Sequence, residues 1–566
     1  MTFGSLSSVF KPGPGRGGAL LSLLVILALA LAACGSGSSS SSSNTPTNTV
    51  LTISTGPTGA YTENFNPFNV ASVDPGARGY IYETLLFFDS MNGSISPMLA
   101  SSYQFSSDAK SITFHLRPNV KWSDGKPFSS ADVVFTLNML KQYPALDSNG
   151  LWDYISRVSA PDSSTVLVNL KQPYTPILWF LGGQTWIVPQ HIWSTAGDPT
   201  RFTNDNPVGT GPYTLKSFSS QLIDLVKNPN YWQPGKPQVT ELRFPAYNTN
   251  TTAELQLDQG NLDWTGLFTP NIQQTYVSRN PSTNHYWFPP GSVVMFYMNL
   301  SKSPFNNVAV RQAISLVINR QQLDNTAESG YEPPASPTGL VLPNQQKYLS
   351  PDYANTSFSV DVNKANQLLQ SAGFTKNSSG IYVDKSGRPL NFNINVVTGW
   401  TDWVTDCQII ASSLKSIGMN ATVNAISYNA YYSALQLGNF DTAISWTSSG
   451  PSPFFMFDAL LASKYSAPIG QAAPTNWERW NDKTTDNLLN QYASSTDSNT
   501  QLQAMYGLEK IMVEQLPAIP LVYGATWNEY STAKFTGWPS PSNPYASPAP
   551  FNYPDSEIVV LNLKAV

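Results

Sequence analysis

Histidines, cysteines and clustered acids most often carry catalysis or hold metals, and in this chain they are few and scattered. There are three histidines, His115, His191 and His285, and two cysteines, Cys34 and Cys407. The sequence has no G-x-S-x-G elbow, no H-E-x-x-H zinc motif, no paired C-x-x-C and no Walker A loop. We therefore assign no catalytic residue, no metal site and no cofactor, and expect a binding protein rather than an enzyme.

Aromatic and neutral polar side chains are the groups here that suit the binding of a small molecule. The 566 residues include 15 Trp and 12% aromatics, whereas only 12% are charged and the net charge is −5. Nucleic-acid binding needs clustered Lys and Arg, so this composition argues against it. The length predicts more than one domain or lobe. Composition alone fits both a large core under a polar surface and an aromatic-lined cleft.

The N-terminal residues have the pattern of a bacterial lipoprotein signal. Lys11 and Arg16 precede an apolar run, Leu20 to Leu31, which is too short for a stable membrane anchor. Leu-Ala-Ala then precedes Cys34, the residue that a lipobox would lipidate. We expect residues 1–33 to be a lipoprotein signal peptide and residues 34–48 a Ser-rich tether. The alternative is an ordinary signal peptide with an incidental cysteine.

Two strands and a helix start are predicted between residues 99 and 136. Alternation at Ile112, Phe114 and Leu116 indicates a strand with one buried face. Ser129 and Asp132 have capping-box spacing before an apolar helical stripe. Elsewhere we expect strands over 50–54, 166–170, 296–299 and 519–523. We expect helices over 80–88, from 306 or 307, from 361 and from about Thr500, which has Gln503 three residues on. Cys407 lies on a predicted buried helical stripe that ends at Gly418.

Five stretches carry a resemblance to a known family. They are L-A…Y, D-x-K-x-x-x-F-x-L-R, W-S-D-G-x-P-F and A-D-V-V-F within 99–136, N-P-V-G-T-G-P-Y at 206–213, and the runs 304–320, 361–374 and 480–523. Together they resemble the family 5 extracytoplasmic solute-binding proteins, the oligopeptide, dipeptide and nickel class that feeds ABC importers. The resemblance covers nearly all of the chain after the tether.

This resemblance implies an α/β, two-lobed periplasmic-binding-protein-like fold (type II, cluster C) with an extra subdomain in the first lobe. The first lobe is expected to comprise residues 49–86, 206–300 and 517–566. Residues 87–205 are expected to form the extra subdomain, and residues 301–516 the second lobe. The ligand would lie between the lobes.

A charged group on a buried ligand needs an opposite charge in the protein, and this requirement bears on the class of ligand. Peptide-binding relatives pair the ligand's ammonium with an aspartate a few residues after a Trp. Here the Trp is Trp446, but the acid's place falls at or near Ser449, so that anchor is in doubt. The loop at Phe65 and Asn66 also departs from the L-D-P of peptide-binding members and resembles members that take carbohydrates.

Stacked aromatic faces and neutral amides suit oligosaccharides. Candidate ligand-binding residues are Phe65, Asn66, Trp264, Trp400, Trp403, Trp446, Ser449 and Trp527. For each tryptophan alone, packing in the core is at least as good an explanation. The two ligand classes stand about even, and oligopeptide leads on the family base rate.

The resemblance implies a role as the solute-binding lipoprotein of an ABC importer. The partners would be an oligopeptide or oligosaccharide, an ABC permease and the membrane through a lipid on Cys34. We expect an extracytoplasmic, lipid-anchored monomer. A lipid-tethered hydrolase is a remote alternative, and a tethered receptor or chaperone without an importer is another.

Overall fold

The computed structural model describes residues 49–56, 58–69, 72–448 and 450–566. The predicted signal peptide (1–33), the lipidated Cys34, the tether (34–48) and Ser449 lie outside the described residues. None of the helices in the described part of the chain is long and apolar enough to span a bilayer.

A seven-stranded sheet forms the first lobe and draws its strands from three distant parts of the chain. Its order is β12-β20-β11-β1-β10-β9-β8. The bounds are β1 Val50–Ser54, β8 Tyr213–Ser219, β9 Leu222–Lys227, β10 Glu241–Pro245, β11 Trp264–Thr265, β12 Asn284–Tyr286 and β20 Glu529–Ser531. β1 pairs in parallel with both β10 and β11, so the N-terminal strand lies at the centre.

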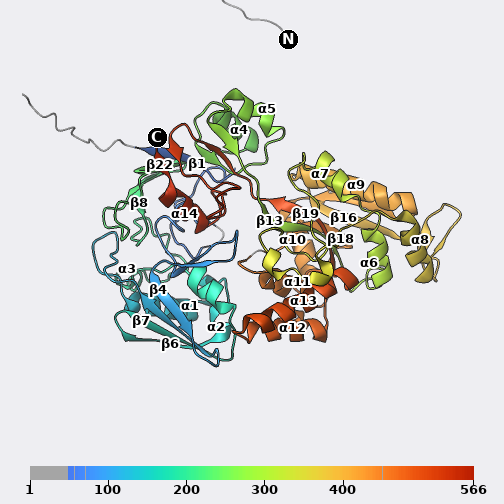
Figure 1. Ribbon diagram of the computed structural model, residues 1–566, viewed down its shortest axis with the longest axis horizontal. Helices are drawn as coiled ribbons and strands as arrows, with labels where there is room; N and C mark the ends of the chain where they lie inside the picture. The colour runs from blue at the N-terminus through green and yellow to red at the C-terminus, as the bar shows by residue number, and fades with distance from the viewer. Residues whose placement is uncertain (1–48, 57, 70–71, 449) are drawn as a thin grey trace, which may run out of the picture. The chain divides into compact units, whose positions relative to one another are not determined.

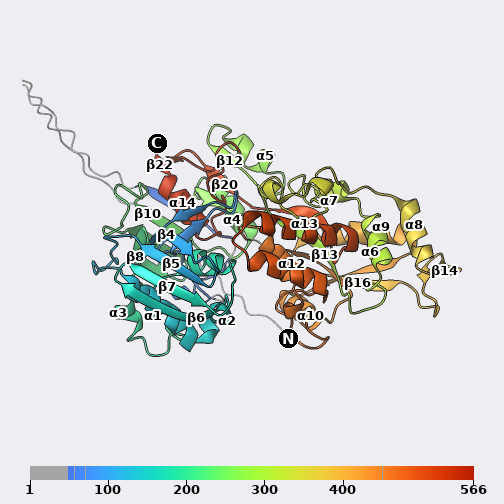
Figure 2. The same cartoon turned by 60° about the horizontal axis from the view of Figure 1, so that its bottom comes forward.

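A five-stranded sheet, β17-β16-β18-β13-β19, forms the second lobe. Its strands are β13 Pro290–Met298, β16 Asn391–Val397, β17 Asn420–Ile426, β18 Thr442–Trp446 and β19 Ala518–Ala525. Its longer helices are α6 Val308–Ser315, α8 Val362–Ser371, α9 Thr401–Ile417, α10 Tyr428–Leu437, α11 Phe454–Leu461, α12 Lys483–Ala493 and α13 Ser498–Gln515. In Figures 1 and 2, α12 and α13 lie side by side next to α11.

The extra subdomain is a four-stranded antiparallel sheet, β4-β5-β7-β6, with one long helix against it (Figure 1). Its elements are β4 Ala100–Phe105, β5 Ser111–Leu116, α1 Ser130–Gln142, β6 Ile155–Asp162 and β7 Thr165–Leu170. The remaining elements that matter below are β2 Leu86–Phe88, β3 Ile95–Pro97, α2 Leu151–Tyr154, α4 Asn250–Asp258, α7 Arg320–Thr326 and α14 Asp555–Asn562.

Side-chain caps set most helix starts where the sequence places them. The backbone N–H of Ser129 donates to Asp132 Oδ2 (3.0 Å), which completes the predicted capping box of α1. Asn307 caps α6 and Asp361 caps α8. The predicted start of α13 is wrong, because Asp497 caps that helix by accepting from the backbone N–H of Thr500 (2.8 Å).

The helix predicted over residues 80–88 is absent, and turns leading into β2 take its place. The carbonyls of Tyr80 and Ile81 accept hydrogen bonds from the distant amides of Tyr213 and Gly211 (both 2.9 Å), so they cannot serve a helical ladder. A Cβ at Gly211 would lie 2.3 Å from the carbonyl oxygen of Tyr80. The G-T-G of the 206–213 motif therefore permits this close approach of two backbones.

The two sheets are joined by a continuous antiparallel ribbon. β12 pairs with β20 in the first sheet, and β13 pairs with β19 in the second. Between the sheets, the amide of Trp287 donates to the Asn528 carbonyl (3.0 Å) and that of Thr526 to the Pro289 carbonyl (2.8 Å). The chain thus changes sheet near residues 287–289 and 526–528, whereas the predicted lobe boundaries were 300/301 and 516/517.

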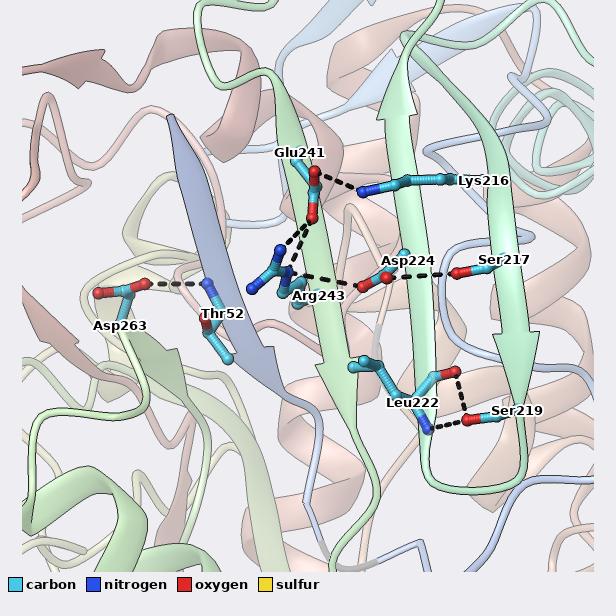
Figure 3. A network of polar contacts seen from close by, with 9 residues as sticks. All are labelled: Thr52, Lys216, Ser217, Ser219, Leu222, Asp224, Glu241, Arg243 and Asp263. Atoms are coloured by element: carbon cyan, nitrogen blue, oxygen red, sulfur yellow. Dashed lines mark hydrogen bonds and ion pairs between the residues drawn. The ribbon is translucent and has the colours of Figure 1, made fainter. Parts of the chain in front are cut away.

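Polar side chains cross three strands of the first sheet, as Figure 3 shows. Glu241 on β10 accepts from Lys216 (2.9 Å) and pairs with Arg243 (2.7 Å), which also approaches Asp224 on β9 (3.7 Å). Burial raises the pKa of Glu241, but the bonds from Lys216 and Arg243 outweigh it and leave that pKa lowered. On the side of β1 that faces away from β10, Asp263 Oδ2 accepts a hydrogen bond from the backbone amide of Thr52 (2.9 Å).

The C-terminal helix α14 places a buried carboxyl group, Glu557, near a second one in the first lobe, Glu83. Both residues are 0% exposed, and burial first and the neighbouring Glu83 carboxyl second raise the pKa of Glu557 well above its usual range. Trp232 Nε1 donates to both oxygens of Glu83 (2.9 and 3.1 Å). Ionising one of two neighbouring buried carboxyl groups disfavours ionisation of the other, so the pair retains a proton. Burial, the largest cause, raises the pKa of Glu83 to about 7.

This pair predicts that unfolding stability falls as pH rises. The pKa of Glu83 is about 4.5 in the unfolded chain and about 7 in the folded protein. Its contribution to the free energy of unfolding is therefore complete below about pH 4.5. It is lost as the pH rises through about 7, a loss of about 3 kcal/mol. In Glu557→Gln the amide donates to an ionised Glu83, so less stability should be lost between pH 5 and pH 8. Denaturant unfolding across this range measures the difference. The exposed Glu514→Gln is the matched control, and a Glu557→Gln slope equal to the control's would contradict the shared proton.

Candidate ligand cavity

A cavity of about 520 Å³ is lined by segments of both lobes and of the extra subdomain. The first lobe contributes residues around 67–91 and 547–555, and the extra subdomain contributes residues within 140–186. The second lobe contributes residues around 290–292, 341–345 and 447–456. Pockets of roughly 300–1,000 Å³ are usual for small-molecule ligands. This cavity is therefore large enough for a ligand that touches both lobes at once.

The cavity wall combines aromatic faces with neutral polar groups. Six aromatic side chains line it: Phe68, Trp179, Phe180, Trp186, Phe551 and Tyr553. Between them lie amides, among them Asn149, Gln184, Asn344 and Asn552, together with several Ser and Thr hydroxyls. Such a wall can stack against the flat apolar faces of a ligand and form hydrogen bonds with the ligand's hydroxyls or peptide groups.

Charged groups are sparse in the cavity wall, where Arg78, Asp147 and Asp555 are present. Asp147 accepts a hydrogen bond from the backbone amide of Trp152 in α2 (3.2 Å), and burial raises its pKa. Asp555 accepts the amide of Ser547 (2.8 Å), and burial raises its pKa to about 7.

Direct contacts join the extra subdomain to the second lobe beside the cavity. The amide of Thr175 donates to the carbonyl of Ala493 (2.7 Å), and Gln501 Nε2 donates to the Thr175 hydroxyl (3.3 Å). The rings of Phe180 and Phe455 pack edge to face, with centroids 5.5 Å apart. The two lobes thus touch each other through the subdomain in this structure.

The structure brings three of the predicted site residues together in an aromatic platform, which we define as Trp400, Trp403, Tyr428 and Trp446. Trp400 lies 5.2 Å from Trp446 and 6.0 Å from Tyr428, between ring centroids. Trp400, Tyr428 and Trp446 follow or end β16, β17 and β18, whose parallel pairing puts their carboxyl ends at one edge. Trp446 is 39% exposed, and Thr447 and Ser448, which follow it in the chain, line the cavity, whereas the four platform residues are not part of its lining.

The other predicted site residues are packed in the interior or at the ribbon crossing. Asn66 is 1% exposed and uses both amide hydrogens on the carbonyls of Pro199 and Phe202. Phe65 is fully buried, as is Trp264, whose Nε1 donates to Asn528 Oδ1 (2.8 Å). Trp527 packs against Phe288 at the crossing, with ring centroids 4.8 Å apart.

Sequence reasoning missed the residues that line the cavity. Phe68, Trp186 and Phe551 come from segments far apart in the chain, and their spacing gives no shared period. Pro67 and Phe68, which line the cavity, directly follow the predicted Phe65 and Asn66 in the same loop. Ser448 and Gly450, which flank the predicted Ser449, also line the cavity.

Side chains that could hold a metal ion are dispersed in the part of the chain that the structure describes. Among the residues that the structure describes, no group of three or more His, Cys, Asp or Glu is placed to hold a metal ion. His191 Nε2 lies 2.8 Å from Asp124 Oδ2. His285 packs against Tyr530. Cys407 is a fully buried free thiol on α9, as predicted.

Comparison with known proteins places these features in a family. The model of the "Bacterial extracellular solute-binding proteins, family 5 Middle" matches residues 94–467, about two thirds of the chain. The nickel-binding periplasmic protein of Escherichia coli K12 is 28% identical over 418 residues, covering 70% of this chain and 75% of that one. The dipeptide-binding protein of the same strain is 24% identical over 492 residues, covering 82% and 88%.

Solved structures agree with the sequence match. A periplasmic oligopeptide-binding protein of an ABC transporter from Thermotoga maritima is 26% identical, with a TM-score of 0.85 and coverage of 92% of this chain and 100% of that one. Its mannohexaose-bound structure gives a TM-score of 0.78 at 26% identity, with coverage of 92% and 99%. With its two-lobed α/β fold, this chain belongs to family 5 of the bacterial extracellular solute-binding proteins.

Proposed function

We propose that this protein captures an extended oligomer in the cavity between its lobes and delivers it, chemically unchanged, to an ABC permease. The carrying observation is the cavity of about 520 Å³ with walls from both lobes. A ligand that contacts both walls binds the closed form better than an open one and so shifts the population toward closure. The crossing ribbon near residues 287–289 and 526–528 is the segment about which closure would occur.

An oligosaccharide is the ligand class that the cavity wall favours. Sugar rings stack on aromatic faces, and their hydroxyls bond to amides and hydroxyl side chains. Six aromatic residues and a neutral polar lining supply both kinds of contact, and Trp446, which is 39% exposed, directly precedes the lining residues Thr447 and Ser448 in the chain. The mannohexaose complex of the Thermotoga relative supports the same assignment.

An oligopeptide is the second candidate, and a specific observation favours it as well. The cavity wall holds one basic residue, Arg78, and two acids, Asp147 and Asp555. These are groups that pair with the termini of a short peptide. The names of the Escherichia coli dipeptide-binding and Thermotoga oligopeptide-binding relatives point the same way. Catalysis is not part of the proposal, since the relatives are solute-binding proteins.

The anchor proposal concerns Cys34. The lipobox-like residues before it and the Ser-rich stretch after it support a diacylglyceryl thioether that holds a monomeric binding protein outside the cytoplasm, at the membrane.

Blocking the cavity should abolish ligand binding without unfolding the protein. Ser448 is exposed and lines the cavity, so Ser448→Trp fills space there at little cost to stability. We expect oligosaccharides or tri- to pentapeptides to raise the melting temperature of the wild type by several degrees and that of Ser448→Trp not at all. Ser379→Trp, at an exposed turn, is the matched control. A shift that survives in Ser448→Trp would place the ligand outside this cavity.

Removing the exposed indole of the platform should weaken binding of whichever oligomer is correct. Trp446→Ala loses a stacking face worth on the order of 1 kcal/mol, so we expect affinity to fall roughly five- to tenfold in calorimetric titration. Leu255→Ala, which removes an exposed apolar side chain from α4 in the first lobe, should leave affinity unchanged. Equal affinities of Trp446→Ala and wild type would remove the platform from the binding site.

Replacing Cys34 should release the protein from the membrane. Without its thiol, Cys34→Ser cannot form the thioether, so we expect the protein in the soluble extracytoplasmic fraction rather than with membranes. Fractionation followed by mass spectrometry of the N-terminal peptide makes the measurement, with Cys407→Ser as the matched control. Retention of Cys34→Ser on membranes would argue for another anchor.

A further inference from the structure

Arg78 is a cation in the cavity wall without an acidic partner. Its Nε donates to the carbonyl of Pro67 (2.8 Å), which fixes the guanidinium in place. The two terminal nitrogens, Nη1 and Nη2, make no hydrogen bond to any residue that the structure describes, and no carboxylate there lies within 4 Å of them. Most other arginines of the first lobe have an acidic partner. Arg243, for example, pairs with both Glu241 and Asp224.

The surroundings of Arg78 are unfavourable for an unpaired charge. Burial lowers the pKa of Arg78, and the neighbouring Tyr553 carries a neutral hydroxyl because burial raises its own pKa. Both Arg78 and Tyr553 line the cavity. A partly buried guanidinium that keeps two nitrogens free is costly until an anion arrives, and a carboxylate matches its planar fork with two parallel hydrogen bonds.

Deepening the proposed function, on which this inference rests, we propose that Arg78 recognises a carboxylate on the bound solute. The same carboxylate chemistry has two sources, the C-terminus of a peptide and the uronic acid of an acidic oligosaccharide. Arg78 holds the carboxylate through Nη1 and Nη2, and the Tyr553 hydroxyl lies beside it as a further donor. The aromatic and amide walls would then hold the body of the oligomer, and Arg78 would set which end or ring enters this part of the cavity.

Matched pairs of probes on the purified full chain test the proposal. Tetraalanine is compared with its C-terminal amide, and trigalacturonate with its methyl ester, by calorimetric titration. We expect the acid form of whichever pair binds to bind at least tenfold more tightly than its neutral form. Which pair shows the difference identifies the source of the carboxylate. Equal affinity of acid and neutral forms for the wild type would overturn the proposal.

Variants assign the effect to this side chain. Arg78→Gln should lower the affinity of the acid form at least tenfold and change that of the neutral form less than twofold, and Arg78→Lys should be intermediate. Arg201→Gln, at a side chain that is 89% exposed, is the matched control. If Arg78→Gln weakens both forms equally, Arg78 only supports the wall and the proposal fails.

A readout that needs no oligomer separates this proposal from the proposed function. Acetate, titrated against chloride at equal ionic strength, should raise the melting temperature of the wild type and not that of Arg78→Gln. Without ligand, Arg78→Gln should melt at or above the wild-type temperature, because it removes an unpaired charge. An equal acetate response in both proteins, or a large loss of stability in Arg78→Gln, would overturn the role of Arg78. Failure of every oligomer to bind while acetate discriminates would instead count against the proposed ligand classes.

Discussion

The ribbon of backbone hydrogen bonds that crosses between the two sheets is the constraint on which the rest of the structure depends. Strand pairing continues through it, from β12 with β20 to β13 with β19. The bonds around Trp287 and Thr526 lie in the short ribbon between the sheets, which is the hinge segment of the proposed closure. Trp527 packs there against Phe288. Each sheet is held together by its own strand pairing, and residues of both lobes line the cavity.

One wall of the cavity lies next to a pair of buried carboxyl groups. Helix α14 and the residues before it supply Tyr553 and Asp555 to the lining, and Glu557 on the same helix is buried near Glu83. Burial raises the pKa of both glutamates, so a retained proton takes the place of the cation that usually pairs with a buried carboxylate. This differs from the ion pairs of Arg243 on the same lobe, in which buried carboxylates meet a half-exposed guanidinium.

Local signals in the sequence were enough for much of the fold. Strand β1 and the caps at Ser129, Asn307 and Asp361 were predicted because each depends on neighbours within a few residues. The helix expected over 80–88 failed because distant amides occupy its carbonyls, which no local pattern reveals. The site was harder still. Of its predicted residues the platform tryptophans come together, but Arg78 and the cavity aromatics are united only by tertiary folding.

The platform also has an optical consequence. Trp446 is 39% exposed, with the ring centroids of Trp400 and Trp403 at 5.2 and 5.5 Å. The fluorescence of an indole responds to the polarity around its ring, and excitation energy transfers readily between indoles this close. Any guest that displaces water from this edge would change the emission of the whole trio. If the proposed site extends to the platform, the protein's own fluorescence would report occupancy without a label.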